Sequence, residues 1–164
     1  MFGNLLVALA VAGLQLAVLI GVALARGIHF DASTAGVGWF LAAAALFTIG
    51  MYGVAEILAS RVPKEEEYIA RVPAIAILPW FLAGSLFPIT ALPSALEWVA
   101  RFLPLTHGLA LMRYGLLGDG AGLHHISRLS STTASAGLSL AVITAFAGLL
   151  TFAAIRVFTR AAIR

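Results

Sequence analysis

The sequence predicts an all-α membrane protein whose chain crosses the bilayer several times. Of its 164 residues, 62% are hydrophobic and only 10% are charged, whereas a soluble domain carries about 25% charged residues to solvate its surface. A membrane-crossing helix needs roughly 20 consecutive apolar residues. Four uncharged stretches reach that length, and they are 1–25, 32–55, 72–96 and 129–155.

This composition also excludes several classes of protein. It excludes a soluble enzyme, a disordered segment and a nucleic-acid-binding domain, because the net charge is only +3 and the basic residues lie at the ends of the apolar stretches. The chain has no cysteine, so disulfides and thiolate metal sites are excluded as well. We therefore interpret the whole chain, 1–164, as a single transmembrane domain.

The first two predicted spans cover about 3–25 and 36–60. The first is longer than the roughly 7 to 15 residues of a signal-peptide core, and no Lys or Arg precedes it, so it is predicted to be a true span. The second has Trp39 near one end as an interfacial aromatic and Glu56 near the other. Glu56 is predicted to reach the membrane interface.

The last two predicted spans cover about 72–88 and 133–158. One begins after Arg71 and Pro73, and the other ends with arginines at 156, 160 and 164. Small residues recur every fourth position in the first and last spans, and such series allow helix backbones to approach closely in lipid. These candidate packing faces, which a chain rich in Ala and Gly also produces by chance, are Gly13, Ala17, Gly21 and Ala25, and Gly137, Ala141 and Ala145.

The segment 89–132 is neither a full span nor a polar loop. Pro93 can open a short amphipathic helix, Pro104 breaks it, Thr106 can cap a second helix, and Gly118 can end that helix. Two helices of about ten residues are too short to cross a bilayer. They predict a re-entrant helical hairpin at about 93–118, with a loop lying on the outer membrane surface as the alternative.

Three motifs that would carry chemistry are incomplete or absent in this chain. Glu66, Glu67 and Arg71 match the EExxxR pattern of intramembrane glutamate proteases, but Pro63 and Lys64 precede them and the FxxxH element is missing, so a charged loop is predicted instead. Adjacent histidines, His124 and His125, lack a third ligand for a metal. The chain has no GxxxxGK[ST] motif, which predicts that it does not hydrolyse nucleotide by itself.

The segment 79–118 resembles the carboxy-terminal signature of ABC-2 type transporter permeases, in particular drug-resistance and lipo-oligosaccharide (nodulation-type) exporters. The signature is a glycine in an apolar helix, an aromatic-Pro pair, a second Pro, an amphipathic segment, a Leu-Pro-Leu-Thr-His run and an Arg. Its fixed points here are Gly84, Phe87, Pro88, Pro93, the segment 97–101, the LPLTH run at 103–107, and Arg113.

The resemblance implies a permease subunit without enzyme activity that exports a hydrophobic drug, lipid or glycolipid-like substrate across a bacterial inner (plasma) membrane. It implies a separate ATPase subunit that binds ATP, a second permease copy, and no cofactor, metal or nucleic acid on this chain. Such permeases have six spans, so the chain is expected to correspond to the last four and to be truncated. A protease-like enzyme and a non-transporting membrane scaffold are the alternatives.

Within that family the hairpin is expected to act as a gate on the outer side. We expect Gly84 to lie where another backbone approaches closely, and Arg113 either to meet anionic groups or to extend to the interface. The candidate gate residues are Gly84, Phe87, Pro88, Pro93, Pro104, His107 and Arg113.

The positive-inside rule predicts the orientation. Six Lys or Arg residues follow the second and fourth spans, against four on the opposite side, at positions 26, 101, 113 and 128. Both chain ends are therefore predicted to lie inside.

Overall fold

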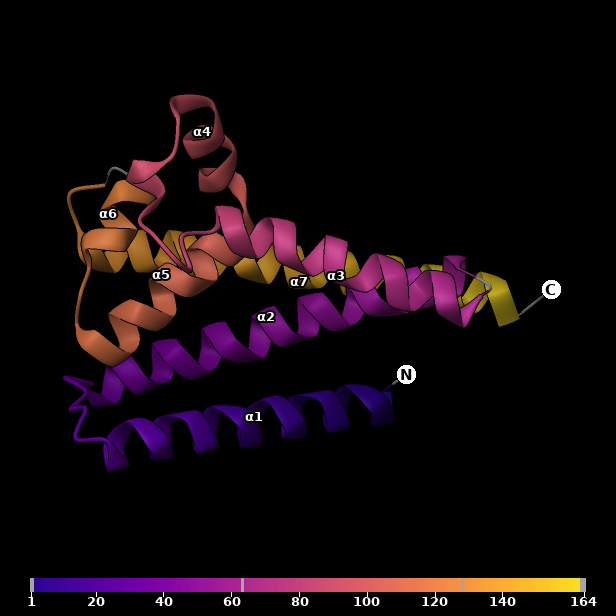
Figure 1. The fold of residues 1–164 in the computed structure, drawn as a ribbon, viewed down its shortest axis with the longest axis horizontal. Coiled ribbons are helices and arrows are strands. Elements are labelled where there is room, and N and C mark those ends of the chain that lie inside the picture. Colours follow the sequence, from indigo (N-terminus) through magenta and orange to yellow (C-terminus); the bar gives the residue numbers. More distant parts are fainter. Residues whose placement is uncertain (1, 63, 128, 163–164) are drawn as a thin grey trace.

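The computed structural model describes residues 2–62, 64–127 and 129–162 and is helical over these ranges, with loops and no strand among them (Figure 1). The all-α prediction is confirmed. Arg128 and Arg164, two of the predicted flanking charges, lie outside the described residues. The elements are α1 (Phe2–Ala25), α2 (Thr34–Arg61), α3 (Glu65–Leu82), a 3-10 turn η1 (Ile89–Ala91), α4 (Ser94–Phe102), α5 (Pro104–Leu117), α6 (Ala121–Ser127) and α7 (Thr132–Ala162).

Among the described residues, three helices are long and apolar enough to cross a membrane: α1, α2 and the part of α7 from Thr132 to Thr159. Their bounds agree within a few residues with the spans predicted at 3–25, 36–60 and 133–158. The chain is therefore a multi-pass membrane protein. Ser33 caps α2 through its side-chain oxygen, which accepts a hydrogen bond from the backbone N–H of Gly36 at 3.0 Å.

Helix α3 differs from the third predicted span. It begins at Glu65 rather than at 72 and ends at Leu82 rather than at 88. The prediction of a charged loop before this span is wrong, because three consecutive glutamates occupy the first turn of the helix. Carboxylates are favourable there, next to the positive end of the helix dipole. Helix α3 has 18 residues, but four of them are charged, Glu65, Glu66, Glu67 and Arg71, and it is not one of the three helices above. Its crossing of the membrane stays a prediction.

Helix α2 is the centre of the bundle and packs against α1, α5 and α7. Its contact with α7 depends on glycine: a Cβ atom on Gly53 would lie 3.0 Å from Leu150, and one on Gly50 would lie 2.8 Å from the ring of Phe146. The faces predicted from Gly13, Gly21 and Gly137 are not packing seams within the chain, because nothing among the described atoms comes within 4 Å of a Cβ there. The spacing alone did not identify the glycines that pack.

Both chain ends and the α2–α3 connection lie at one end of the bundle, whereas the α1–α2 connection, the end of α5 and α6 lie at the other (Figure 1). We call these the Arg61 end and the Thr34 end, after the last and first residues of α2.

The predicted helix pair is confirmed, with one change in how it is built. Pro93 precedes α4, and Gly118 ends α5 in the left-handed conformation, at φ +67°. The second helix is not capped by Thr106: it begins at Pro104, with Leu103 as its N-terminal cap. Proline is favoured at the first helical position because its fixed φ suits the helix and its missing N–H would have no partner there. The short helix α6 was not predicted.

Candidate functional site

Helix α5 is seated tightly on the first half of α2. A Cβ atom on Gly115 would lie 2.5 Å from the carbonyl oxygen of Gly36 and 2.9 Å from the backbone nitrogen of Phe40. One on Gly108 would lie 3.8 Å from the ring of Phe47. Helix α5 therefore runs alongside α2 from the middle of that helix to its Thr34 end, at the close spacing that glycine permits.

A buried histidine holds the corner between α4 and α5. The Nε2 atom of His107 lies 3.0 Å from the carbonyl oxygen of Arg101, and its Nδ1 atom lies 3.1 Å from the hydroxyl oxygen of Ser139 on α7. A carbonyl oxygen only accepts, so Nε2 carries the proton and donates to Arg101. In the neutral ring Nδ1 then accepts the hydroxyl proton of Ser139. His107 thus joins the end of α4, the start of α5 and α7.

Helix α4 has the two faces that its sequence predicts. Glu97 and Arg101 form an ion pair at 2.5 Å, with both side chains largely buried. Trp98 and Phe102, in contrast, are exposed, with their ring centroids 4.9 Å apart. Figure 1 shows α4 standing away from the α2–α7 bundle. Its ion pair faces the protein and its aromatic side chains face outward.

The turn after α3 brings Gly84 to Arg113. Gly84 has φ +80°, a conformation that side chains other than glycine rarely adopt. A Cβ atom there would lie 3.0 Å from the side chain of Ile89. The expected close approach to Gly84 is thus made by its own turn and not by another helix backbone. The carbonyl oxygen of Gly84 accepts a 2.7 Å hydrogen bond from Nη2 of Arg113 on α5.

A cavity of about 230 Å³ lies beside this bond, and polar as well as apolar side chains line it. Arg113, Asp119 and His125 line it, together with Thr106, whose buried hydroxyl has no hydrogen-bond partner among the described residues. Both signs of charge, one imidazole and two threonine hydroxyls therefore line one space. Such a site suits a polar group that both donates and accepts hydrogen bonds.

The structure brings together only some of the predicted gate residues. Gly84, Pro88 and Arg113 line the polar cavity, whereas Pro104 lines a separate apolar hollow and His107 lies on the α7 side of the corner. Phe87 packs edge-on against Phe81 of α3, with ring centroids 5.5 Å apart. Pro93 lines none of these three hollows.

Sequence reasoning missed Asp119, His125 and Thr106 as cavity residues. Thr106 was predicted only as a helix cap. The His124–His125 pair was weighed as a metal site, but no group of three His, Cys, Asp or Glu side chains placed to hold a metal occurs in the described part of the chain. His124 instead bonds the carbonyl oxygen of Leu129 at 2.8 Å and the hydroxyl of Thr132 at 2.9 Å, so it ties α6 to the start of α7.

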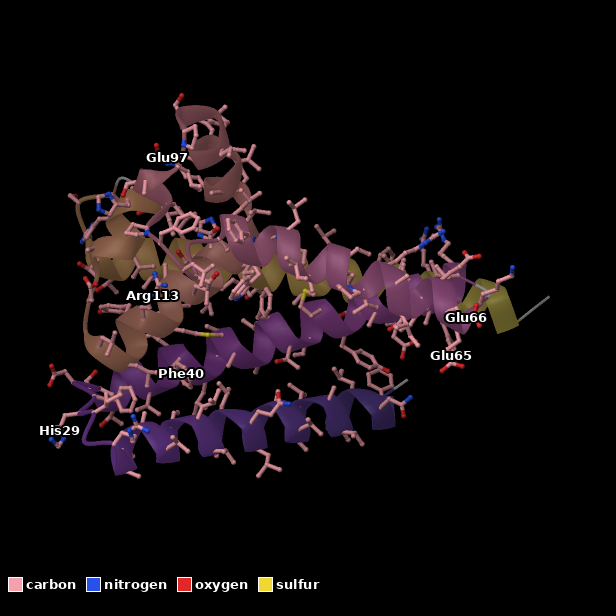
Figure 2. The ribbon with its side chains drawn as sticks, viewed as in Figure 1. His29, Phe40, Glu65, Glu66, Glu97 and Arg113 are labelled. Atoms are coloured by element: carbon pink, nitrogen blue, oxygen red, sulfur yellow. The ribbon has the colours of Figure 1, made fainter. Side chains whose placement is uncertain are left out.

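The other candidate charges lie elsewhere. Figure 2 shows Glu65 and Glu66 at the opposite end of the bundle from Arg113. Glu67 forms an exposed 3.4 Å ion pair with Arg71. Glu56, in α2, accepts a hydrogen bond from the hydroxyl of Tyr52 one turn earlier.

Two curated relatives are similar to parts of this chain. Nodulation protein J of Rhizobium meliloti (strain 1021) is 33% identical over 107 residues, which make up 60% of this chain and 41% of that protein. Nodulation protein J of Rhizobium leguminosarum bv. viciae is 39% identical over 54 residues, 32% of this chain and 21% of that protein. The aligned part of the chain thus covers less than half the length of either relative. No solved structure matches.

The family model described as ABC-2 type transporter matches residues 1–117, which include α1 to α5. The match therefore contains the Gly84 turn and α5, which line the polar cavity, and ends before α6, the other helix that lines it. The match covers well over half of the chain, and the chain belongs to the ABC-2 type transporter family.

Proposed function

We propose that this chain forms part of the permease of an exporter in which a separate ATPase subunit hydrolyses ATP. The substrate is a hydrophobic drug, lipid or glycolipid-like molecule that moves outward across the plasma membrane. Family membership and the similarity to two nodulation proteins support this proposal. A second permease copy is the expected partner across the conduit.

The observation that carries the mechanism is the hydrogen bond from Arg113 to the carbonyl oxygen of Gly84. Helix α5 is fixed to α2 by the Gly36–Gly115 contact, whereas the turn after α3 is joined to α5 at Arg113. A hydrogen bond with a charged partner contributes about 1.5 to 3 kcal/mol. That is strong enough to hold the turn closed and weak enough to break in each cycle, so we propose that parting Arg113 from Gly84 opens the polar cavity.

The orientation prediction can be tested directly, because the chain has no cysteine of its own. Both termini and the α2–α3 connection share the Arg61 end of the bundle (Figure 1), and the positive-inside rule predicts that this end faces the cytoplasm. A membrane-impermeant maleimide added to intact cells should label Asp119→Cys and not Lys64→Cys. Labelling of Lys64→Cys alone would reverse the orientation.

The proposed function is tested by efflux from cells that supply an ATPase subunit and the rest of the permease. Arg113→Ala should lower ATP-dependent efflux with little loss of folded protein, because the side chain is exposed on α5. Arg113→Lys should retain part of the activity, since an ammonium group still donates a hydrogen bond.

The control for this variant is Arg156→Ala. Arg156 is also exposed, but it lies on α7, where it covers the ring of Phe152 at 4.8 Å. Its loss should leave efflux unchanged. Wild-type efflux that does not depend on ATP would contradict the proposed function, and normal efflux by Arg113→Ala would contradict the gate.

A further inference from the structure

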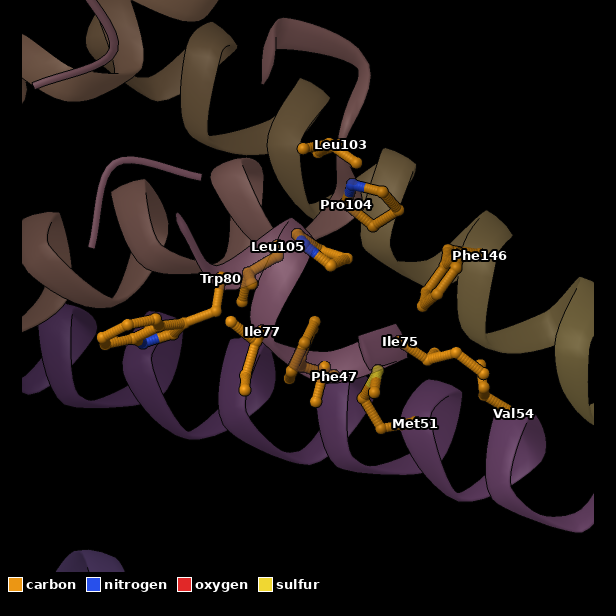
Figure 3. Close-up of a pocket in the computed structure, with 12 residues that line it drawn as sticks. Phe47, Met51, Val54, Ile75, Ile77, Trp80, Leu103, Pro104, Leu105 and Phe146 are labelled. Carbon is orange, nitrogen blue, oxygen red and sulfur yellow. The ribbon is translucent and has the colours of Figure 1, made fainter. Parts of the chain in front are cut away.

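An apolar groove follows the seam between α2 and α3, and it shares no lining residue with the polar cavity. Its larger part has a volume of about 420 Å³ and is enclosed by α2, α3, the α4–α5 corner and Phe146 of α7 (Figure 3). A smaller hollow of about 70 Å³ continues it toward Tyr68. The two hollows share four lining residues, Met51, Val54, Ile75 and Ala76.

The groove lies at the depth of the bilayer centre. Phe47, on its α2 wall, is 13 residues after Thr34 and 14 before Arg61. At 1.5 Å per residue each distance is about 20 Å, so Phe47 lies near the middle of a membrane-crossing helix. Water is absent at that depth, and polar groups there cost several kcal/mol unless they are paired.

The chemistry of the walls limits the occupant. All twelve residues that line the larger hollow are aliphatic, aromatic, methionine or proline, as Figure 3 shows for ten of them. Sites for drug-like ligands usually add a few polar groups that fix the orientation of the ligand. The indole N–H of Trp80 is the one polar side-chain group among these twelve residues, so the part of a molecule that fits is a plain hydrocarbon segment.

The size and shape of the groove argue against a helix from a partner protein. A helix with its side chains is about 10 to 12 Å wide, so one turn fills roughly 400 Å³ or more. The larger hollow would hold a single turn, and its narrow continuation would hold none. A flexible alkyl chain can follow both hollows along the seam.

We propose that the acyl chain of a bilayer phospholipid binds in this groove, between α2 and α3, and reaches the corner at Leu103, Pro104 and Leu105. The lipid wedges α3 away from α2, two helices that make few direct contacts with each other. The binding does not depend on the proposed transport activity. A further consequence does: because the chain end touches the corner between α4 and α5, occupancy of the groove biases the gate.

Trp80 lines the groove and supplies the probe. With Trp39→Phe and Trp98→Phe, Trp80 is the only tryptophan left of three. The assembled permease is placed in lipid nanodiscs that contain a phospholipid brominated on its acyl chain, in increasing proportion. Quenching of Trp80 fluorescence should rise to saturation at a low fraction of brominated lipid.

Two variants fill the groove from opposite walls, Ala76→Phe on α3 and Val54→Phe on α2. Each should abolish the saturable quenching. The matched control is Ala70→Phe, which adds the same ring to an exposed position of α3 that does not line the groove. It should keep the quenching. A protein with Trp98 alone is the reference for each variant, since Trp98 is exposed on α4, outside the groove, and its quenching should not change. The thermal unfolding midpoint shows whether each variant is folded.

Three results would overturn the proposal. Trp80 that is not quenched in the assembled permease would mean that a second copy or another permease segment covers the groove. Quenching that survives both filling variants would place the lipid elsewhere. Quenching by a brominated single-chain amphiphile but not by the phospholipid would assign the groove to the tail of another molecule.

Normal lipid binding without efflux would contradict the proposed function and leave the lipid site intact.

Discussion

We expect Gly115→Leu to unseat α5 from α2 and to leave little folded protein. The Cβ atom of any larger residue at this position would meet the carbonyl oxygen of Gly36 at 2.5 Å and the backbone nitrogen of Phe40 at 2.9 Å. Both are backbone atoms of a membrane-crossing helix, so they cannot move aside as a flexible side chain can. Overpacking costs about 1 to 3 kcal/mol where neighbours can shift, and we expect a loss at or above the upper value here.

The matched control is Gly137→Leu on α7, where nothing among the described atoms lies within 4 Å of an added Cβ. The thermal unfolding midpoints of the purified proteins in nanodiscs compare the two variants. Gly115→Leu should lower the midpoint strongly or prevent purification, whereas Gly137→Leu should behave like the wild type. Equal midpoints for Gly115→Leu and the wild type would contradict the backbone contact.

The sequence predicted the elements whose signals are local. Long uncharged stretches located α1, α2 and α7, since a lipid-exposed helix needs an apolar side chain at nearly every position. Pro93, Pro104 and Gly118 located the two short helices, because each residue restricts its own backbone. The start of α3 was missed for a local reason as well: Glu65–Glu67 were interpreted as a solvated loop, although carboxylates also favour the first turn of a helix.

The contacts between helices were not predictable in the same way. Gly13 and Gly115 are both glycines in apolar helices, yet only Gly115 meets another backbone. Small-residue spacing indicates that a close approach is sterically possible and does not specify the partner helix. The polar cavity was missed for the same reason, since Thr106 and His125 come from different helices and meet only in the folded chain.

The corner between α4 and α5 shows how a local prediction and a distant contact combine. Pro104 predicted the break, but His107 fixes it through a hydrogen bond to Arg101 and a second to Ser139, which is 32 residues away in the sequence. The carbonyl of Arg101 lies in the last turn of α4, where the backbone offers no intrahelical partner. The imidazole of His107 supplies the missing donor.

We therefore expect His107→Leu to destabilise the protein and to reduce efflux. Both effects should be larger than the change in side-chain volume alone would produce. Leucine leaves two groups without their partner, the carbonyl of Arg101 and the hydroxyl of Ser139, which is fully buried. Each unsatisfied buried group costs about 1 to 3 kcal/mol, so the free energy of unfolding should fall by at least about 2 kcal/mol. His125→Leu, at an exposed position of α6, is the control and should leave stability unchanged.

A double-mutant cycle with Ser139→Ala separates the hydrogen bond from the loss of packing. If the hydroxyl of Ser139 donates to His107, then Ser139→Ala should destabilise the wild type and cost less in the His107→Leu background, because its partner is already gone. Coupling between contacting residues is about 0.5 to 3 kcal/mol. His107→Gln should recover part of the stability, since its amide N–H can still donate to the carbonyl of Arg101. Additive effects of His107→Leu and Ser139→Ala, with no recovery in His107→Gln, would show that His107 fills space at the corner without holding α4 to α7.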